Sequence, residues 1–384
     1  MIKNRFTLIV LLIVCFGISM PAGSQPLQQF SSEGYIVLTA DRFDEFKLTS
    51  PQNLSGSVTA KSVSGNKVEM SIEYRGKAEN RDIYDWLQGL VEINSSSADR
   101  VAEIDISTPD NAPWEGLDKS ISVNLKIDIP ETARLGLDGQ FYSITVEGPF
   151  PGLDIENEYG DIAVREINGD VNITAGYKKV ELREIQGEVN VFSNSGSITA
   201  RDINCGNSKC RFETTQGGIE LRSIEGEIEA VTSYKPIEIV DCDAGLGVIY
   251  AVNNYAPIII NNVSGVLDLT TNYGKINVND GTLPPGRSKI STNYEPIELR
   301  GVTMDESFLT VNNIYSDIRI WFAETPAARV FLATDEGGTI HTVGLPIKAT
   351  ALTRNRFEGF IGGARSSVEA NIQGIGKIEL RGAD

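Results

Sequence analysis

The chain has 384 residues, 52 of them acidic and 34 basic, so its formal net charge is −18 at pH 7. Such an excess of carboxylates excludes nucleic acid as a partner, since Lys and Arg must neutralise phosphates, and it also disfavours binding to anionic lipid headgroups. A chain of this length can bury a large core, and we expect two structural units.

Residues 1–24 have the pattern of a secretory signal peptide. Lys3 and Arg5 precede a short apolar run, and Ala22 and Ser24 fit a cleavage before Gln25. No second apolar segment of membrane-spanning length follows. We therefore expect an extracytoplasmic protein, secreted, periplasmic or on the cell surface, that is not inserted in a membrane once the leader is removed.

Residues 25–150 are predicted to form an N-terminal antiparallel β unit. Apolar and polar residues alternate in five segments, at 35–38, 56–60, 67–74, 101–106 and 120–130. Residues 82–90 have the composition of one or two helical turns. We expect this unit to cap the repeats that follow, because an exposed terminal coil would be an unpaired edge.

From about residue 150 to 345 the chain repeats a short segment, as in GDIAVREI, KKVELREI and GGIELRSI. Successive copies are 18 or 21 residues apart, and a fixed period near 20 residues indicates a solenoid. The last residues of the eight copies are Ile167, Ile185, Ile203, Ile224, Cys242, Val263, Gly281 and Val302.

Each repeat alternates with period 2 and contains two short strands separated by turn residues. This pattern predicts an all-β fold, a right-handed parallel β-helix with coils of 18–21 residues over 151–384. A sandwich of nine-residue antiparallel strands is the structural alternative. In the β-helix, one column of aliphatic residues should stack inward, formed by Ile162, Val180, Ile198, Ile219, Ile237, Ile258, Ile276 and Ile297.

A tyrosine stands three residues before the first apolar residue of most repeats. Asn254, Asn272 and Asn293 directly precede three of these tyrosines. Stacked rings and amides would order the turn. Alternatively, exposed ring faces would form a ligand strip for a glycan or peptide, formed by Tyr234, Tyr255, Tyr273, Tyr294 and Tyr315. Tyr159 and Tyr177 hold the same place in earlier repeats.

A second column is charged. Its arginines occupy the outward position after an inward aliphatic residue, at Arg165, Arg183, Arg201, Arg222 and Arg300. Glu166, Glu184 and Asp202 follow three of them. Interleaved acids would make this a solvated face, whereas unpaired arginines would form a basic stripe for an anionic polysaccharide.

Four cysteines are present. Cys15 lies in the leader and is not expected to carry lipid, because a bulky valine precedes it. Cys205 and Cys210 bracket CGNSKC, and in an oxidising compartment they could close a small disulfide loop. Cys210 aligns with inward positions, however, and could point into the core instead. Cys242 has the place of a small buried hydrophobic residue.

No catalytic, cofactor-binding or metal-binding residues are predicted. His341, the single histidine of the sequence, occupies an outward position, so it offers no catalytic triad. The densest acidic cluster is Asp154, Glu156, Glu158 and Asp161, which the high acid content alone would produce. We therefore expect a non-enzymatic binding or structural module with a glycan or surface protein as partner. The alternatives are a carbohydrate-active β-helix enzyme and a self-assembling envelope scaffold.

Two stretches carry a family likeness: SVNLKIDIPETARLGLDGQFYSITVEG, and the xYGxIxV units after it. Together they resemble the putative-adhesin family of bacterial envelope proteins, the DUF4097-like and head-domain adhesins. The resemblance implies a right-handed β-helix, an extracytoplasmic location and an adhesive or scaffold role, with no catalytic residues to carry over. The tyrosine column and the turns at Pro236, Pro257 and Pro296 depart from the family pattern.

Overall fold

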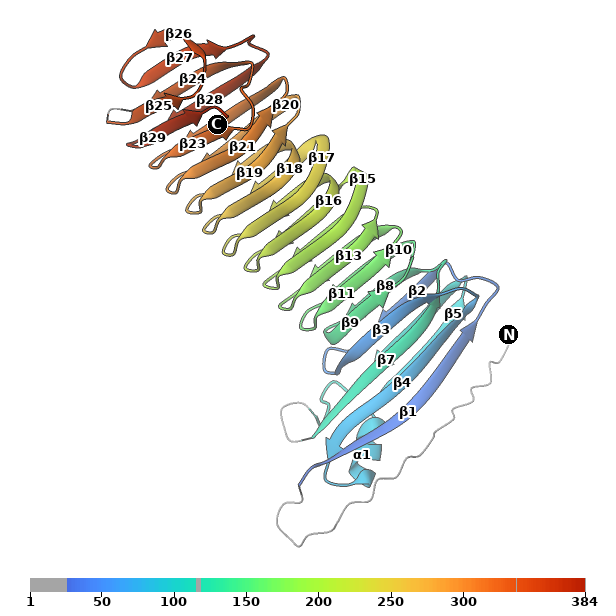
Figure 1. Cartoon of the computed structure of the whole chain (residues 1–384). Helices are drawn as coiled ribbons and strands as arrows, with labels where there is room; N and C mark the ends of the chain where they lie inside the picture. The colour runs from blue at the N-terminus through green and yellow to red at the C-terminus, as the bar shows by residue number, and fades with distance from the viewer. Residues whose placement is uncertain (1–25, 115–118, 336, 384) are drawn as a thin grey trace. The chain divides into compact units, whose positions relative to one another are not determined.

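Strands make up most of the structure, a computed structural model that describes residues 26–114, 119–335 and 337–383. The signal peptide and Cys15 predictions fall outside these residues. Within the described ranges there are 29 strands and one helix (Figure 1). No helix among them is both long and apolar enough to cross a membrane. The chain divides into two units after Val180, and each unit is described by itself.

The first unit contains twelve strands and helix α1 (Arg81–Gln88). Asn80 caps the helix by accepting a hydrogen bond from the Ile83 N–H at 3.0 Å, and Tyr84 and Leu87 anchor it in the core. The strands are β1 (Gln28–Thr39), β2 (Glu45–Thr49), β3 (Ser55–Val63), β4 (Lys67–Ala78), β5 (Glu92–Ala98), β6 (Val101–Ser107), β7 (Ser120–Pro130), β8 (Arg134–Gly139), β9 (Phe141–Glu147), β10 (Gly152–Asn157), β11 (Ile162–Ile167) and β12 (Asp170–Ala175).

One layer of this unit runs in the order β1, β4, β7, β3, β9 and β11 (Figure 1). The pairings of β1 with β4 and of β4 with β7 are antiparallel, as the predicted cap requires. From β7 onward the pairing is parallel, with Val58 opposite Leu125 on one side and Ile144 on the other. Parallel stacking thus begins at β3, well before residue 150.

A second layer of the first unit follows the same rule. β5 pairs with β6 in antiparallel fashion, and β6, β2, β8, β10 and β12 then follow in parallel. Leu48, Leu137, Ile155 and Ile173 form one row across these strands, and all are buried. The apolar alternation of each strand therefore fills the space between the two layers.

The second unit is the regular solenoid and its C-terminal end. Its strands are β13 (Val180–Gln186), β14 (Val189–Ser193), β15 (Ile198–Thr214), β16 (Ile219–Val231), β17 (Ile237–Val252), β18 (Ile258–Thr270), β19 (Ile276–Leu283), β20 (Gly286–Thr292), β21 (Ile297–Met304), β22 (Ser307–Asn313), β23 (Ile318–Phe322), β24 (Ala328–Thr334), β25 (Thr339–Val343), β26 (Ile347–Leu352), β27 (Arg356–Ile361), β28 (Ser366–Ile372) and β29 (Lys377–Arg381).

Equivalent residues of successive coils pair in parallel register. Ile219 lies opposite Ile237, which lies opposite Ile258, and the column continues through Ile276 and Ile297. These side chains are at most 2% exposed. The parallel β-helix prediction is confirmed, and the antiparallel sandwich alternative is wrong.

A corner of left-handed backbone recurs in every regular coil. Two consecutive residues face outward there before the chain turns inward again, as at Arg222 and Ser223 before Ile224. The second of the two has φ between 51° and 66°, a conformation that costs a residue with a Cβ about 1–2 kcal/mol. The corner residues are Glu166, Glu184, Asp202, Ser223, Asp241, Asn262, Asp280 and Gly301.

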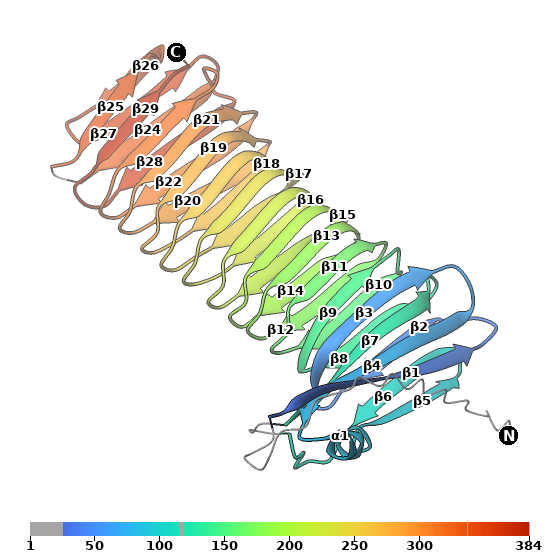
Figure 2. The same ribbon diagram turned by 60° about the horizontal axis from the view of Figure 1, so that its bottom comes forward.

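The last strands of the chain do not form the last coil of the stack. β28 lies between β22 and β24 and is parallel to both, and β29 likewise lies between β23 and β25 (Figure 2). The last strands in sequence are therefore interpolated one level below the end of the stack. β27 pairs with the far edge of β24 in antiparallel fashion, and β26 pairs with β27. The antiparallel strands of this excursion, at residues 347–361, lie beyond the repeats that end near residue 345, so the repeat alone could not place them.

Candidate functional site

The tyrosine column is present and partly exposed. In the second unit, neighbouring rings from Tyr234 to Tyr315 have centroids 4.8–5.3 Å apart and planes 1–24° apart. Each of these side chains is 48–58% exposed. In the first unit Phe141, Tyr159 and Tyr177 stack in the same way.

This stacking changes what the column offers to a ligand. Because neighbouring rings are nearly parallel at van der Waals separation, their faces turn toward one another along the column. Solvent meets the ring edges and hydroxyl groups instead. The flat row of exposed faces, on which the ligand-strip hypothesis depends, is therefore missing between Tyr234 and Tyr315.

Amides order the turn beside these rings. Asn272 donates to Asn254 at 2.6 Å, and Asn293 donates to Asn272 at 2.9 Å. A second, buried column lies two residues before each tyrosine, and sequence reasoning missed it. There Asn253 donates to the Lys235 carbonyl of the preceding coil at 2.7 Å and accepts from the Ala256 N–H at 3.0 Å. Thr271, Thr292 and Asn313 occupy its place in later coils.

The arginine column is interleaved with acids. Arg201 lies 2.8 Å from Glu220, and Arg300 lies 2.8 Å from Glu298. Arg183 lies 2.9 Å from its neighbour Glu184. These pairs are exposed, so each contributes little stability. They neutralise the basic stripe that an anionic polysaccharide would need.

The remaining predicted residues are held in structural contacts. Cys205 and Cys210 are joined in a disulfide, with Cα atoms 6.1 Å apart, and both are buried. Burial raises the pKa of the Cys242 thiol to about 11, which keeps it protonated and unreactive near neutral pH. His341 lies exposed on β25.

The acidic cluster at residues 154–161 does not converge on one point. Asp154 accepts two hydrogen bonds from Arg134, at 2.7 and 3.0 Å, and this partner lowers the pKa of Asp154. Glu158 accepts from Gln140 at 2.6 Å. Across the described ranges, no group of three or more His, Cys, Asp or Glu side chains is placed to hold a metal ion.

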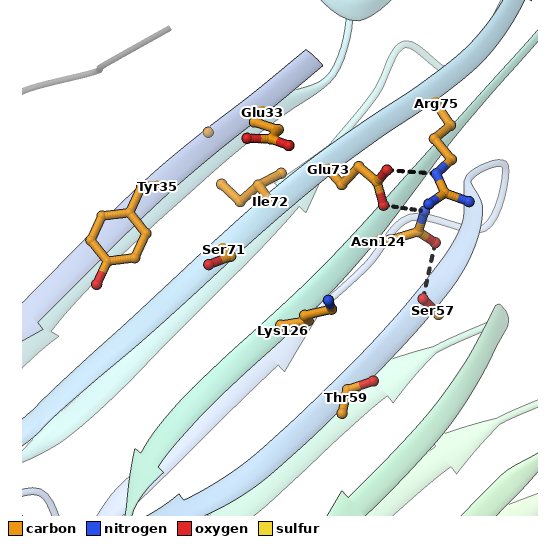
Figure 3. A pocket seen from close by; sticks show the side chains of 11 residues that line it. Glu33, Tyr35, Ser57, Thr59, Ser71, Ile72, Glu73, Arg75, Asn124 and Lys126 are labelled. Atoms are coloured by element: carbon orange, nitrogen blue, oxygen red, sulfur yellow. Dashed lines mark hydrogen bonds and ion pairs between the residues drawn. The ribbon is translucent and has the colours of Figure 1, made fainter. Parts of the chain in front are cut away.

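A concave surface that the sequence did not predict lies on the first unit. It is a trough of about 810 Å³ on the outer face of β1, β4, β7 and β3 (Figure 3). Its floor consists of the outward residues of four neighbouring strands. The apolar residues of these strands predict the sheet and its buried face, but the polar residues that alternate with them do not show which strands lie side by side, so the trough could not be predicted from them.

The trough is built from two cross-strand rows, which the strand register places directly opposite one another. The hydroxyl row consists of Tyr35, Ser71, Lys126 and Thr59, and the amide row consists of Glu33, Glu73, Asn124 and Ser57. Figure 3 shows both rows crossing the four strands. Strands lie about 4.8 Å apart, so each row spans roughly 14 Å, and the rows lie about 7 Å apart along the strands.

The two rows differ in how their groups are used. In the amide row, Ser57 donates to Asn124 at 2.9 Å, and Asn124 donates to Glu73 at 3.5 Å. Glu73 also accepts from the Arg75 Nε at 2.7 Å, and this bond raises the pKa of Arg75. Three members of the amide row, Ser57, Asn124 and Glu73, are thus held in fixed orientation, whereas none of these bonds includes Glu33.

The hydroxyl row is largely uncommitted. Among the described residues, no hydrogen bond or ion pair joins Ser71, Lys126 or Thr59 to another side chain. Tyr35 is 45% exposed, and partial desolvation together with a hydrogen bond to Glu69 raises its pKa. Free donors and acceptors beside side chains of fixed orientation are what a polar ligand requires.

The trough continues at both ends along β4. Toward one end a hollow of about 570 Å³ is lined by Phe30, Lys77, Ser120 and Ser122, and it shares Glu73 and Arg75 with the trough. Toward the other end a hollow of about 390 Å³ is lined by Lys67, Glu69 and Asp128. A ligand lying in the trough therefore meets open, polar surface in both directions.

No protein-family model matches the chain, and no curated protein sequence matches it either. Solved structures similar to it include a putative cell adhesion protein from Clostridium sporogenes, at 12% identity over 92% of this chain and 100% of that one, with a TM-score of 0.22. A putative adhesin from Bacteroides fragilis has 12% identity, 93% and 100% coverage and a TM-score of 0.26. A putative lipid binding protein from Parabacteroides distasonis has 10% identity, 91% and 96% coverage and a TM-score of 0.25. Likeness this weak establishes no function for the chain.

Proposed function

We propose that the chain is an extracytoplasmic, non-enzymatic binding module whose ligand lies in the trough of the first unit. One observation carries this proposal: the trough gathers uncommitted polar groups from four strands into a single concavity. The columns of the solenoid, in contrast, satisfy their own groups, which gives them a structural role. The extracytoplasmic location rests on the predicted leader at residues 1–24.

The competing enzyme hypothesis needs acidic groups that converge on a substrate. Asp154 and Glu158 are bonded to separate partners, Arg134 and Gln140. In the trough the Glu73 carboxylate is held by Arg75 and Asn124. These commitments favour binding over acid–base chemistry.

The test screens the mature chain, residues 25–384, against an array of glycans and peptides and against bacterial envelope fractions. Ser71→Trp should abolish binding, because the indole fills the trough without entering the core. Ser96→Trp, at another exposed serine on β5 of the same unit, is the matched control and should bind normally. The Tyr273→Ala, Tyr294→Ala double variant should also bind normally.

Two results would overturn this assignment. Loss of binding in the tyrosine double variant, with binding retained in Ser71→Trp, would move the site to the tyrosine column. Failure of the folded wild-type chain to bind any probe would refute the proposal that the chain is a binding module. Circular dichroism and melting temperature confirm in each case that the variant is folded.

A further inference from the structure

The floor of the trough presents side chains only. β4 is paired on both sides, by β1 and β7, and β7 is paired by β4 and β3. β3 is likewise paired on both sides, by β7 and β9. The backbone N–H and C=O groups of these three strands are already used in the sheet, so an extended peptide cannot add a strand over them. Among the described strands, β1, at the edge of the trough, pairs with β4 alone, and a strand added to its outer edge would lie beside the trough and not across its floor.

The charges of the trough are balanced. Its lining carries two carboxylates, Glu33 and Glu73, and two cations, Arg75 and Lys126. Arg75 already pairs with Glu73, and the chain as a whole carries a net charge of −18. A polyanion would find one unpaired cation, Lys126, and would be repelled by the net negative charge of the chain. A polycation would find one unpaired carboxylate, Glu33. Neither type of polyion is matched by this surface.

The uncommitted groups suit a ligand rich in hydroxyl groups. Ser71 and Thr59 can each donate and accept, and the Lys126 ammonium donates. Tyr35 adds a half-exposed aromatic ring at the edge of the same row, and such a ring packs against the apolar C–H face of a sugar. About 7 Å further along β4, Glu73, Asn124 and Ser57 of the amide row would provide fixed acceptors and donors to the next part of the ligand.

From these contacts we infer that the trough binds an internal segment of a neutral, linear polysaccharide, running along β4 across the hydroxyl row and the amide row. This inference rests on the proposed binding function and assigns its ligand class. The trough is open at both ends, so the ligand need not present a chain terminus. Recognition uses hydrogen bonds from Ser71, Thr59 and Lys126 and packing on Tyr35.

Isothermal titration calorimetry on the mature chain tests the ligand class. The neutral probes are hexasaccharides of β-1,4-linked glucose, β-1,3-linked glucose, α-1,4-linked glucose and β-1,4-linked N-acetylglucosamine. Hexagalacturonate is the anionic probe, and a twelve-residue Ser/Thr/Gly peptide is the extended peptide probe. At least one neutral probe should bind, and its affinity should change less than about twofold between 50 and 500 mM NaCl, because no net charge is neutralised.

Variants locate that binding. Ser71→Trp should weaken it more than about tenfold, and Lys126→Ala and Thr59→Ala should each weaken it about fivefold to tenfold through the loss of one hydrogen bond. Tyr35→Ala should weaken it more than Tyr35→Phe, which keeps the ring. Ser96→Trp should bind as the wild type does.

The outcomes separate the two proposals. Binding of hexagalacturonate or of the peptide alone, abolished by Ser71→Trp, would overturn the ligand class and leave the binding module standing. Neutral-sugar binding that Ser71→Trp leaves unchanged would overturn the trough as its site. Absence of any binding that depends on the trough would overturn both.

Discussion

The columns of the solenoid and the rows of the trough are built by the same rule but from different residues. In both, strand pairing brings side chains of neighbouring strands about 4.8 Å apart. In the columns like meets like, as in Tyr273 on Tyr294 or Asn272 on Asn254. In the trough unlike residues meet, as Tyr35, Ser71 and Lys126 do in the hydroxyl row.

This difference separates architecture from recognition. A column of identical residues satisfies itself, since each amide donates to the next and each ring covers its neighbour. A mixed row leaves groups without partners, and those groups are available to a ligand. Repetition therefore stabilises the solenoid, whereas the irregular first unit presents the chemically distinct surface. Four predictions would break or sharpen this contrast.

The largest effect is expected from a charge placed in an inward column. Ile258→Asp buries an unpaired carboxylate at a position that is fully buried and should lower the free energy of unfolding by about 3–5 kcal/mol. Ile259→Asp, one residue along the same strand, faces outward and should cost less than about 1 kcal/mol. Urea denaturation followed by circular dichroism measures both. Equal losses would contradict the inward stack.

Alkaline pH should act on a buried phenol of the first unit. Burial raises the pKa of Tyr142 to about 12, above about 10 for an unfolded chain. Between these values the native state keeps a proton that the unfolded state loses. The stabilisation is therefore intact below pH 10 and falls as pH rises toward 12.

In the wild type this titration should lower the free energy of unfolding by about 2–3 kcal/mol between pH 10 and 12, and Tyr142→Phe should abolish that decrease. Denaturation midpoints at pH 8, 10 and 11.5, compared between the wild type and the variant, measure the effect. As pH rises from 8 to 11.5, the stability of the wild type should fall relative to that of the variant. Parallel curves over the whole range would show that Tyr142 does not carry the alkaline transition.

The buried and exposed amides of one turn should differ in how much they contribute to the free energy of unfolding. Asn253→Ala leaves the Lys235 carbonyl and the Ala256 N–H without their partner and should cost about 1–3 kcal/mol. Asn254→Ala removes an exposed side-chain hydrogen bond, the one that Asn254 accepts from Asn272, and should cost less than about 0.5 kcal/mol. Asn253→Thr should recover part of the loss, since threonine occupies this place in the next two coils. A larger loss for Asn254 than for Asn253 would reverse this assignment.

The smallest effect concerns the left-handed corner. Ser223 has φ 54°, so Ser223→Gly should relieve strain and stabilise the chain by about 0.5 kcal/mol after the entropy of glycine is counted. The reciprocal change, Gly301→Ser, should destabilise it, because a Cβ there would come within 2.3 Å of Asp280 Oδ1. Melting temperatures of the pair should shift in opposite directions; shifts of the same sign would refute the corner interpretation.

Much of the solenoid could be predicted because its signal is repeated. A single inward isoleucine such as Ile237 says little, but its recurrence every 18 or 21 residues fixed both the parallel stacking and the inward face. The exposed tyrosines were equally visible. Their ring orientation was not, because it depends on side-chain torsions that spacing does not determine.

The trough and the C-terminal end could not be predicted in this way. Lys126 and Ser71 lie 55 positions apart, and their adjacency depends on the register of an antiparallel pair. The place of β28 between β22 and β24 depends on an excursion with no repeat of its own. Both features come from pairings between distant, unlike segments, for which a single sequence holds no periodic signal.

The interpolated last strands also set the order in which the chain can be completed. Until Val368 on β28 is in place, β22 and β24 lack the partner between them, and until Leu380 on β29 is in place the same holds for β23 and β25. Because β28 and β29 follow β22 to β25 in the chain, this level closes only after all of these earlier strands have been synthesised. β28 and β29 thus complete the wall of the solenoid, and a chain that stops before Ser366 keeps a gap there that a protease can enter.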